Sequence, residues 1–406
     1  MRVINTLFYL LAILPFATLA QPQAGDVLPH WSEGYLDLHH INTGRGECLF
    51  AIFPDGTTMM VDAGETGTDK RNFKPNGSRS AGEWIARYIQ HVTQPLDDKT
   101  IDYMLLTHFH DDHMGSLAHA GRPSADGGYI LSGITEVGDR LPFKTLIDRG
   151  YPDYNWPKPL DQDPDIQNYR KFVRHHLRKG GQAAQFQVGT DQQFTLSKAP
   201  HSYPTFKVRN IAANGLIWTG KGEETSSHIP PIDQLQTADY PGENTLSTVF
   251  KISYGKFDYF NGADIVDTEK PGLWGNIEAP IGQVTGPVDV CEVNHHGKTA
   301  MSAAFIAAVT PRVFLIQGFA LTHPDVPALS NMLSRSIYPD ERDVFTTNLL
   351  APNRVTLGPD LVSQLKSTQG HILVRVAPGG DTYSIYILDD SAESYTIKSV
   401  HHYTSK

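Results

Sequence analysis

The sequence predicts a layered α/β protein in which helices lie outside two packed β-sheets. Strand-like apolar runs alternate with helical patterns in two halves of the chain, and no internal repeat or low-complexity tract interrupts them. A chain of 406 residues with 40% hydrophobic and 19% charged residues has a globular composition and can bury a substantial core. This composition argues against a disordered, collagen-like or multi-span membrane protein.

The first 20 residues have the features of a cleavable secretory signal peptide. Arg2 precedes an apolar stretch at residues 7–16, and residues 18–20 form a small-residue cleavage pattern before Gln21. The stretch is shorter than the roughly 20 apolar residues that span a bilayer, although an uncleaved anchor is the alternative. We therefore expect a secreted or periplasmic protein without stable membrane insertion after cleavage. Residues 21–30 would then be a short lead into one domain at 31–406.

The domain is expected to begin with strands and to continue into a helix. Gly44, Gly46 and Asp55-Gly56 supply turns between strand-like runs, which predicts an antiparallel meander. Ser80 with Glu83 forms a capping box that opens a helix with an apolar stripe. The expected elements are strands at residues 35–41, 48–53 and 57–61, a helix at 80–92, and a buried strand at 101–106.

The chain from about residue 121 to residue 242 is rich in Pro, Gly and Asp, so we interpret it as an irregular, partly helical insertion. Its one clear helix lies between Asp163-Pro164 and Gly180-Gly181. Regular patterns then return, and a strand-rich extension covers about 365–406. The expected strands are 245–254 and 257–260 as a hairpin, one ending at 293, then 313–316, 371–376, 383–388 and 395–400, with helices at 164–179, 299–308 and after Pro327.

Cys48 and Cys291 both lie in apolar, strand-like runs. An oxidising compartment would allow the two thiols to pair, whereas a free buried cysteine behaves as a small hydrophobic residue. Buried, unpaired thiols are the expected state, with a disulfide as the alternative.

A dense group of candidate metal ligands follows the buried strand at 101–106. His108, His110, Asp112 and His113 fall within six residues, and buried polar groups of this kind need partners. Imidazole and carboxylate groups are the usual ligands of zinc and related ions. The two-residue spacing puts His108 and His110 on one side of an extended backbone, and Asp112 and His113 can face a second ion. A capped polar loop would explain one Asp and none of the histidines.

These residues resemble the His-x-His-x-Asp-His signature of the metallo-β-lactamase superfamily. The chain most resembles the branch that contains the extracellular hydrolase domain of bacterial DNA-uptake proteins and the phosphorylcholine esterases. Further segments match in the same order, over about residues 35–330. They are Asn42-Thr43-Gly44-Arg45-Gly46-Glu47, Val61-Asp62-Ala63-Gly64, Asn244-Thr245-Leu246-Ser247, Asn261-Gly262-Ala263-Asp264, Val293-Asn294-His295-His296-Gly297 and His323-Pro324.

The resemblance implies a four-layer αβ/βα sandwich with two divalent metal ions at one edge of the sheets. Zinc is favoured, with manganese and iron as alternatives. Asp264 matches the family's carboxylate that bridges both ions. The last ligand falls at His295-His296, where His296 is favoured as the direct ligand and His295 as a supporting or substrate-contacting residue.

Two departures from the family pattern bear on the site. Many members supply a third histidine just before the bridging Asp, whereas this chain has Glu243-Asn244-Thr245-Leu246-Ser247 there. The DNA-uptake branch likewise has Asn and Ser at this place, and His201 or His228 could still reach the first site from the insertion. In the first motif, Asn42, Arg45 and Glu47 stand where the branch more often has Asp, Gln and Asp. The second departure bears on the substrate pocket rather than on the metals.

The ion pair predicts a hydrolase, because two divalent ions lower the pKa of a bound water and deliver hydroxide near neutral pH. Asp112 is expected to orient that hydroxide, and His323 to contact the substrate or protonate its leaving group. Asp62 could orient a ligand histidine or cap the following loop. Asn244 is a candidate for a supporting or substrate contact.

A phosphoester or phosphodiester is the favoured substrate. Arg170 and Arg174 recur with Arg178 on one face of the helix at 164–179 and could receive an anion, although a solvated helix face is the alternative. The net charge of −10 favours a small anionic substrate over nucleic acid. The alternatives are a lactone, ester or β-lactam hydrolase, and a non-catalytic secreted binding module of the same fold.

Overall fold

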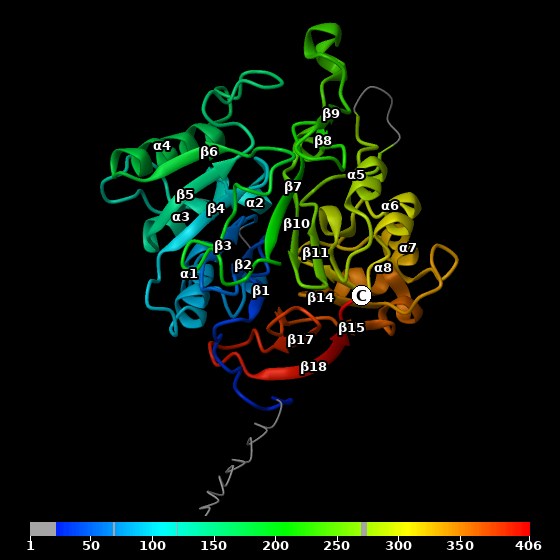
Figure 1. Ribbon diagram of the computed structural model, residues 1–406. Coiled ribbons are helices and arrows are strands. Elements are labelled where there is room, and N and C mark those ends of the chain that lie inside the picture. The colour runs from blue at the N-terminus through cyan, green and yellow to red at the C-terminus, as the bar shows by residue number, and fades with distance from the viewer. Residues whose placement is uncertain (1–21, 68–69, 120, 269–273) are drawn as a thin grey trace, which may run out of the picture.

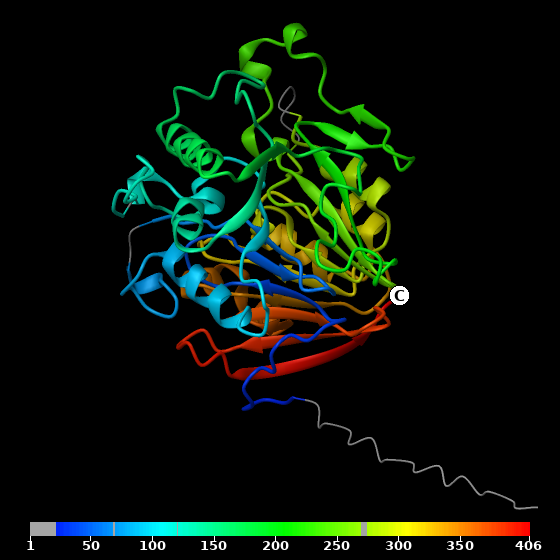
Figure 2. The same cartoon turned by 60° about the vertical axis from the view of Figure 1, so that its left-hand side comes forward.

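Two nine-stranded β-sheets pack face to face, and helices cover the outer face of each, as both views of the computed structural model show (Figures 1 and 2). This is the αβ/βα sandwich that the sequence predicts. The structure describes residues 22–67, 70–119, 121–268 and 274–406, so the predicted signal peptide lies outside the described residues. Within these ranges, no helix combines the length and the apolar character needed to cross a membrane.

The first sheet has the strand order β18-β17-β16-β1-β2-β3-β4-β5-β6. The predicted meander is confirmed, because β2 pairs antiparallel with both β1 and β3, and the sheet continues in parallel from β3 to β6. Its strands are β1 (Leu36–His40), β2 (Leu49–Ile52), β3 (Thr58–Val61), β4 (Ile101–Leu106), β5 (Phe143–Asp148), β6 (Gln182–Gln185), β16 (His371–Val376), β17 (Thr382–Leu388) and β18 (Ile397–Thr404).

The second sheet has the strand order β15-β14-β13-β12-β11-β10-β7-β8-β9. The strands β10 and β11 form the predicted hairpin, and β11 to β15 run parallel. Its strands are β7 (Lys207–Ala213), β8 (Leu216–Trp218), β9 (Thr225–Ser227), β10 (Val249–Tyr254), β11 (Phe257–Asn261), β12 (Val290–Glu292), β13 (Val313–Ile316), β14 (Asp343–Thr346) and β15 (Leu365–Ser367).

The helices lie in two outer layers, at the left and right of Figure 1. The helices α1 (Ala81–Val92), α3 (Ile134–Arg140) and α4 (Pro164–Arg178) cover the first sheet, and α5 (Glu278–Thr285), α6 (Ala303–Val309), α7 (Val326–Leu333) and α8 (Ala351–Val362) cover the second. The shorter helical turns are α2 (Asp111–Met114), η1 (Lys70–Asn72), η2 (Leu117–His119), η3 (Ile232–Gln234), η4 (Thr237–Asp239), η5 (Glu243–Leu246) and η6 (Asn294–Gly297).

Strand alternation divides the apolar residues among three clusters. In β2, Phe50 and Ile52 face the helices of the first layer, whereas Leu49 and Ala51 face the second sheet. Successive side chains of a strand point to opposite faces, so each sheet buries both of its faces. The apolar cluster that contains Leu49 and Ala51 fills the space between the two sheets.

The predicted helix starts at Ser80 and Asp163 are confirmed. The Ser80 hydroxyl accepts from the Glu83 N–H, and the Asp163 carboxylate accepts from the N–H groups of Asp165 and Ile166. Each cap satisfies amide groups that have no partner within their helix.

Other predicted boundaries shift for local backbone reasons. The helix α6 begins at Ala303 rather than at residue 299, because Thr299 and Met301 have φ values of 50° and 62°. The strand β10 begins at Val249 because η5 occupies residues expected to be extended. The last strand begins at Ile397, after Tyr395 with φ 48°.

Residues 121–242 are more regular than their composition indicates. This segment contributes β5 and β6 to the first sheet and β7, β8 and β9 to the second. The C-terminal strands β16 to β18 (red, at the base in both figures) extend the first sheet beyond β1, in which Leu36 pairs with Val376.

The two cysteine thiols, Cys48 and Cys291, are buried and unpaired, as expected. Burial raises the pKa of both thiols well above its usual value. These cysteines therefore act as small apolar core residues.

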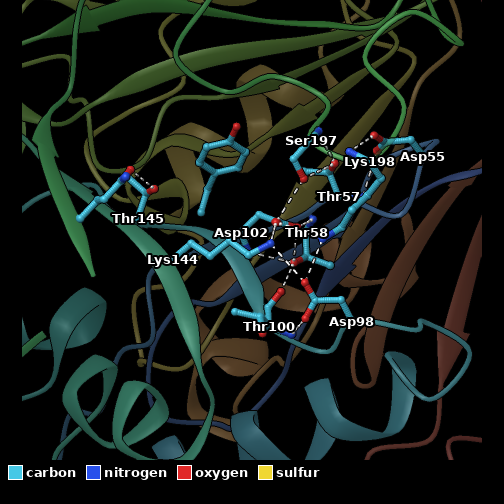
Figure 3. A network of polar contacts seen from close by, with 12 residues as sticks. Asp55, Thr57, Thr58, Asp98, Thr100, Asp102, Lys144, Thr145, Ser197 and Lys198 are labelled. Carbon is cyan, nitrogen blue, oxygen red and sulfur yellow. Dashed lines mark hydrogen bonds and ion pairs between the residues drawn. The ribbon is translucent and has the colours of Figure 1, made fainter. Parts of the chain in front are cut away.

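A polar network around Asp102 fixes the start of β4 (Figure 3). The candidate ligands follow the other end of this strand. Buried Asp102 accepts from the Thr58 N–H at 2.9 Å, from Lys144 Nζ at 2.7 Å and from Lys198 Nζ at 3.2 Å. Ser197 Oγ donates to the same carboxylate at 3.1 Å. The network therefore joins β3, β4 and β5 to the loop that follows β6.

Candidate metal centre

The candidate ligands lie just after the carboxyl ends of β4, β11 and β12. His108, His110 and His113 follow β4, Asp264 follows β11, and His296 follows β12. The strands β3 and β4 are parallel, as are β11 and β12, so that their carboxyl ends meet at one edge of the sandwich. Residues that are far apart in the sequence are thereby brought into one group.

Asp264 divides its two oxygens between two groups of histidines. Its Oδ1 lies 3.1 Å from His113 Nε2 and 3.4 Å from His296 Nε2. Its Oδ2 lies 3.7 Å from His108 Nε2 and 3.8 Å from His295 Nε2. One buried carboxylate thus lies close to the ring nitrogens of four histidines.

We define the first site as His108, His110 and Asp264, whose ligand atoms lie close together. His108 Nε2 and His110 Nδ1 are 3.1 Å apart. We define the second site as His113, His296 and Asp264, with Asp112 beside them. Asp112 Oδ2 lies 3.6 Å from His296 Nε2, and Asp112 Oδ1 lies 3.9 Å from His113 Nε2.

The second site contains buried polar atoms that lack a hydrogen bond. His113 Nε2, His296 Nε2 and Asp264 Oδ1 converge, yet none makes a hydrogen bond of acceptable geometry with the described residues. Buried polar atoms without partners are costly, and two imidazole nitrogens with a carboxylate oxygen suit a divalent cation. The residues therefore fit a metal ion.

Asp62 orients the His113 ring through a hydrogen bond with Nδ1. Its Oδ2 accepts from His113 Nδ1 at 2.7 Å, and its carboxylate also accepts from the Thr107 N–H at 2.8 Å and from Thr107 Oγ1 at 2.7 Å. A proton on Nδ1 leaves Nε2 free to bind a metal. Asp62 is thus held at the end of β3 by the strand that carries the ligands.

Glu47 lies beside Nδ1 of His296, as Asp62 does for His113. Glu47 was not predicted to be a site residue. His296 Nδ1 lies 3.1 Å from the Gln317 carbonyl oxygen and 3.2 Å from Glu47 Oε2. Glu47 is also close enough to His113, Asp264 and His296 to be a ligand itself. Burial, and then the negative charge of Glu292, raise the pKa of Glu47 to about 8. The sequence signal for Glu47 was its position in the segment at 42–47, which resembles a motif of the family.

The charges of the site are strongly interdependent. Burial alone would raise the pKa of Asp264, but His113 and His296 hold it well below its usual value. Burial would lower the pKa of His113, but Asp264 and Asp62 raise it well above. Burial and the neighbouring His113 lower the pKa of His108 well below its usual value. Asp264 is thus an ionised carboxylate and His108 a neutral imidazole, whereas the carboxylates around His113 favour its protonated form.

Left-handed backbone conformations are concentrated at this edge. Asp62, Ala263, His295 and His296 have φ values of 58°, 46°, 47° and 56°. Such conformations are costly for residues other than glycine and are found where the surrounding structure imposes them.

Glu278 imposes the conformation around η6. Its buried carboxylate accepts from Asn294 Nδ2 at 2.6 Å, from the Met301 N–H at 2.8 Å and from the Ser302 N–H at 2.8 Å. It thereby holds the segment before and after the two histidines.

His323 packs against the second site. Its ring stacks on His296 with centroids 4.6 Å apart and planes 19° apart, and Phe319 contacts both rings edge-on. Asn353 Nδ2 donates to the His323 carbonyl at 2.8 Å, which fixes its backbone. His323 Nδ1 is buried and has no hydrogen-bond partner among the described residues.

Asn244 lies beside His295, with Nδ2 3.1 Å from His295 Nε2. When Asn244 donates this bond, the ring nitrogen is occupied, and His295 then supports the site rather than acting as a ligand. The structure therefore brings Asn244 to the ligand cluster.

Other candidates lie outside the ligand cluster. The Arg170 guanidinium group lies 5.1 Å from the centre of the Tyr154 ring, and Arg174 is exposed on α4. Within the described residues, neither arginine contacts a candidate ligand. His201 is exposed, and His228 Nε2 lies 3.2 Å from Asn276 Oδ1. The described part of the chain thus shows no third histidine reaching the first site from either position.

Comparisons with known proteins found a family match and similar solved structures. Residues 45–189 match the family model described as the metallo-beta-lactamase superfamily. No curated protein matches the chain. A solved structure of a proposed metal-dependent hydrolase from Parabacteroides distasonis ATCC 8503 is 12% identical, covers 81% of this chain and 100% of its own, and has a TM-score of 0.36. Over residues 45–189, which include His108, His110, Asp112 and His113, the chain is therefore similar to the metallo-beta-lactamase superfamily.

Proposed function

We propose that the protein is a secreted dinuclear hydrolase that cleaves a phosphoester or phosphodiester of small, anionic character. The observation that carries the dinuclear assignment is the position of Asp264, whose Oδ1 faces His113 and His296 of the second site and whose Oδ2 faces His108 of the first. Imidazole and carboxylate ligands suit zinc, which we propose as the metal. The N-terminal signal pattern supports secretion.

The bound ions supply Lewis acidity and a nucleophile at neutral pH. Asp62 holds the His113 ring in the tautomer that presents Nε2, and Gln317 and Glu47 do the same for His296. Asp112, whose side chain is 20% exposed, lies between these two rings on the accessible side. We assign Asp112 to hold the proton of the attacking water.

His323 is assigned to the leaving group. Burial, and then the neighbouring His296, lower the pKa of His323 well below its usual value, so that the ring is neutral at pH 7. A neutral imidazole donates a hydrogen bond to a leaving oxygen without carrying a positive charge. Packing between Phe319 and His296 fixes the ring for that purpose.

The phosphoester assignment rests on the resemblance of the ordered motifs to those of the DNA-uptake hydrolase domain and the phosphorylcholine esterases. The proposed pair of ions, an arrangement that many phosphatases and nucleases use, also supports it. The formal charge of −10 disfavours a long polyanion, because non-specific binding of nucleic acid depends on clustered cations. A small phosphoester needs fewer clustered cations for binding.

The test measures metal content first and activity second. We expect two zinc ions per chain and cleavage of bis(p-nitrophenyl) phosphate or a phosphorylcholine ester. His108→Ala should lose the first ion and the activity, whereas His228→Ala, which removes a histidine outside the site, should retain both. Cleavage of only a lactone, an ester or a β-lactam would refute the phosphoester assignment. Protein that binds no metal, or activity that survives His108→Ala, would refute the hydrolase mechanism.

A further inference from the structure

Buried Arg149 and partly buried Glu243 form a bidentate ion pair beside the first site. Arg149 Nε donates to Glu243 Oε1 at 2.7 Å, and Arg149 Nη2 donates to Glu243 Oε2. The Arg149 side chain is 0% exposed and that of Glu243 is 18% exposed. A buried charge is unfavourable without a partner, so this pair has a strongly defined geometry.

Glu243 also binds the backbone between two ligands of the first site. The Phe109 N–H donates to Glu243 Oε1 at 2.9 Å, and Phe109 separates His108 from His110. The Arg149 guanidinium group lies 4.7 Å from the centre of the Phe109 ring. The ion pair thus holds both the peptide and the side chain of the residue between the two histidines.

Arg149 and Glu243 are each held by further contacts. Arg149 Nη1 donates to Asn214 Oδ1 at 3.2 Å and to the Trp156 carbonyl at 3.3 Å, so that the guanidinium group cannot turn independently. Glu243 begins η5, and the next residue, Asn244, contacts His295. One short turn therefore contacts the loop of His108 and His110 and also the loop of His295.

We propose that Glu243, held by Arg149, is a positioning residue that sets the metal affinity of the first site. Its carboxylate fixes the peptide between His108 and His110, so that the two rings lie together beside Asp264. Supporting contacts of this kind change metal affinity by about 10- to 100-fold when removed. The inference rests on the proposed dinuclear site, since it concerns one of its two ions.

The experiment compares Glu243→Gln with Asp37→Asn. Asp37 is a matched control, because it is buried, forms a bidentate pair with Arg375 at 2.8 and 2.6 Å, and contacts no metal ligand among the described residues. Zinc content and affinity are measured by competition with a chromophoric chelator, and the melting temperature of each metal-free protein is recorded. We expect both variants to melt below the wild type, but only Glu243→Gln to lose affinity for one of two ions, by at least about tenfold.

Arg149→Lys provides a second variant if Glu243→Gln does not fold. Lysine keeps the positive charge but cannot form both bonds of the fork, so we expect an affinity loss smaller than that of Glu243→Gln. Two ions bound with wild-type affinity in a folded Glu243→Gln or Arg149→Lys protein would overturn the inference. An equal affinity loss in Asp37→Asn would also overturn it. Wild-type protein that binds fewer than two ions would instead contradict the proposed dinuclear site.

Discussion

Asp62 Oδ2 accepts a hydrogen bond from His113 Nδ1 at 2.7 Å, and both side chains are fully buried. Asp62→Asn should weaken zinc binding at the second site by about 10- to 100-fold, because the amide no longer stabilises the required tautomer and basicity of His113. Asparagine tolerates the left-handed backbone at this position, which limits other effects. Chelator competition gives the affinity, and unchanged binding at both sites would contradict this role of Asp62.

His323→Gln should retain both metals and lose about 10²- to 10³-fold in turnover of a substrate with a poor leaving group, because the hydrogen bond to the leaving oxygen is lost. The loss should be much smaller for a p-nitrophenyl ester, whose leaving oxygen needs little help. The comparison of the two substrates measures leaving-group assistance directly. Equal losses on both would show that His323 acts through structure or substrate binding instead.

Asp102→Asn should destabilise the protein by about 1–3 kcal/mol without changing its metal content. The substitution weakens the contacts of one buried carboxylate with Thr58, Lys144 and Lys198, at the far end of β4 from the site (Figure 3). Urea denaturation gives the free energy of unfolding, and zinc analysis gives the content. A fall in zinc affinity would show that this end of the strand influences the ligands.

His371 should make stability depend on pH between about 4 and 6.5. Burial lowers its pKa from 6.5 to about 4, and its Nδ1 accepts from the Asn42 N–H at 3.0 Å, which requires a neutral nitrogen. In this interval the unfolded chain binds the proton and the folded protein does not, so stability falls as pH falls. Relative to pH 7, the wild type should lose about 3 kcal/mol more than His371→Gln at pH 4. Urea curves of equal pH dependence for both proteins would contradict this.

Much of the fold was predictable because its signals are local. The run at 101–106 is apolar and precedes the histidines, so both β4 and the first ligands could be assigned without knowing their neighbours. Ser80 and Asp163 likewise cap the helices that follow them. The strand β6 could not be assigned, since Gln182–Gln185 has a polar sequence and extends only by pairing with β5.

The supporting residues of the site could not be predicted, because they meet only in the folded protein. Arg149 and Glu243 are 94 residues apart, and neither belongs to a motif with a recognisable spacing. Glu47 reaches His296 only when the two sheets pack. The role of the α4 arginines stays a prediction. Their four-residue spacing is real, but sequence does not give the direction in which a helix face points.

The pairing of Leu36 with Val376 has a consequence for biosynthesis. The strand β1 precedes the segment at 42–47, yet one of its two neighbours in the sheet is β16, about 340 residues later in the chain. A growing polypeptide therefore carries an incomplete sheet edge throughout most of its synthesis. Such an edge can bind the wrong strand, so a chain released before β16 is made would be prone to aggregate.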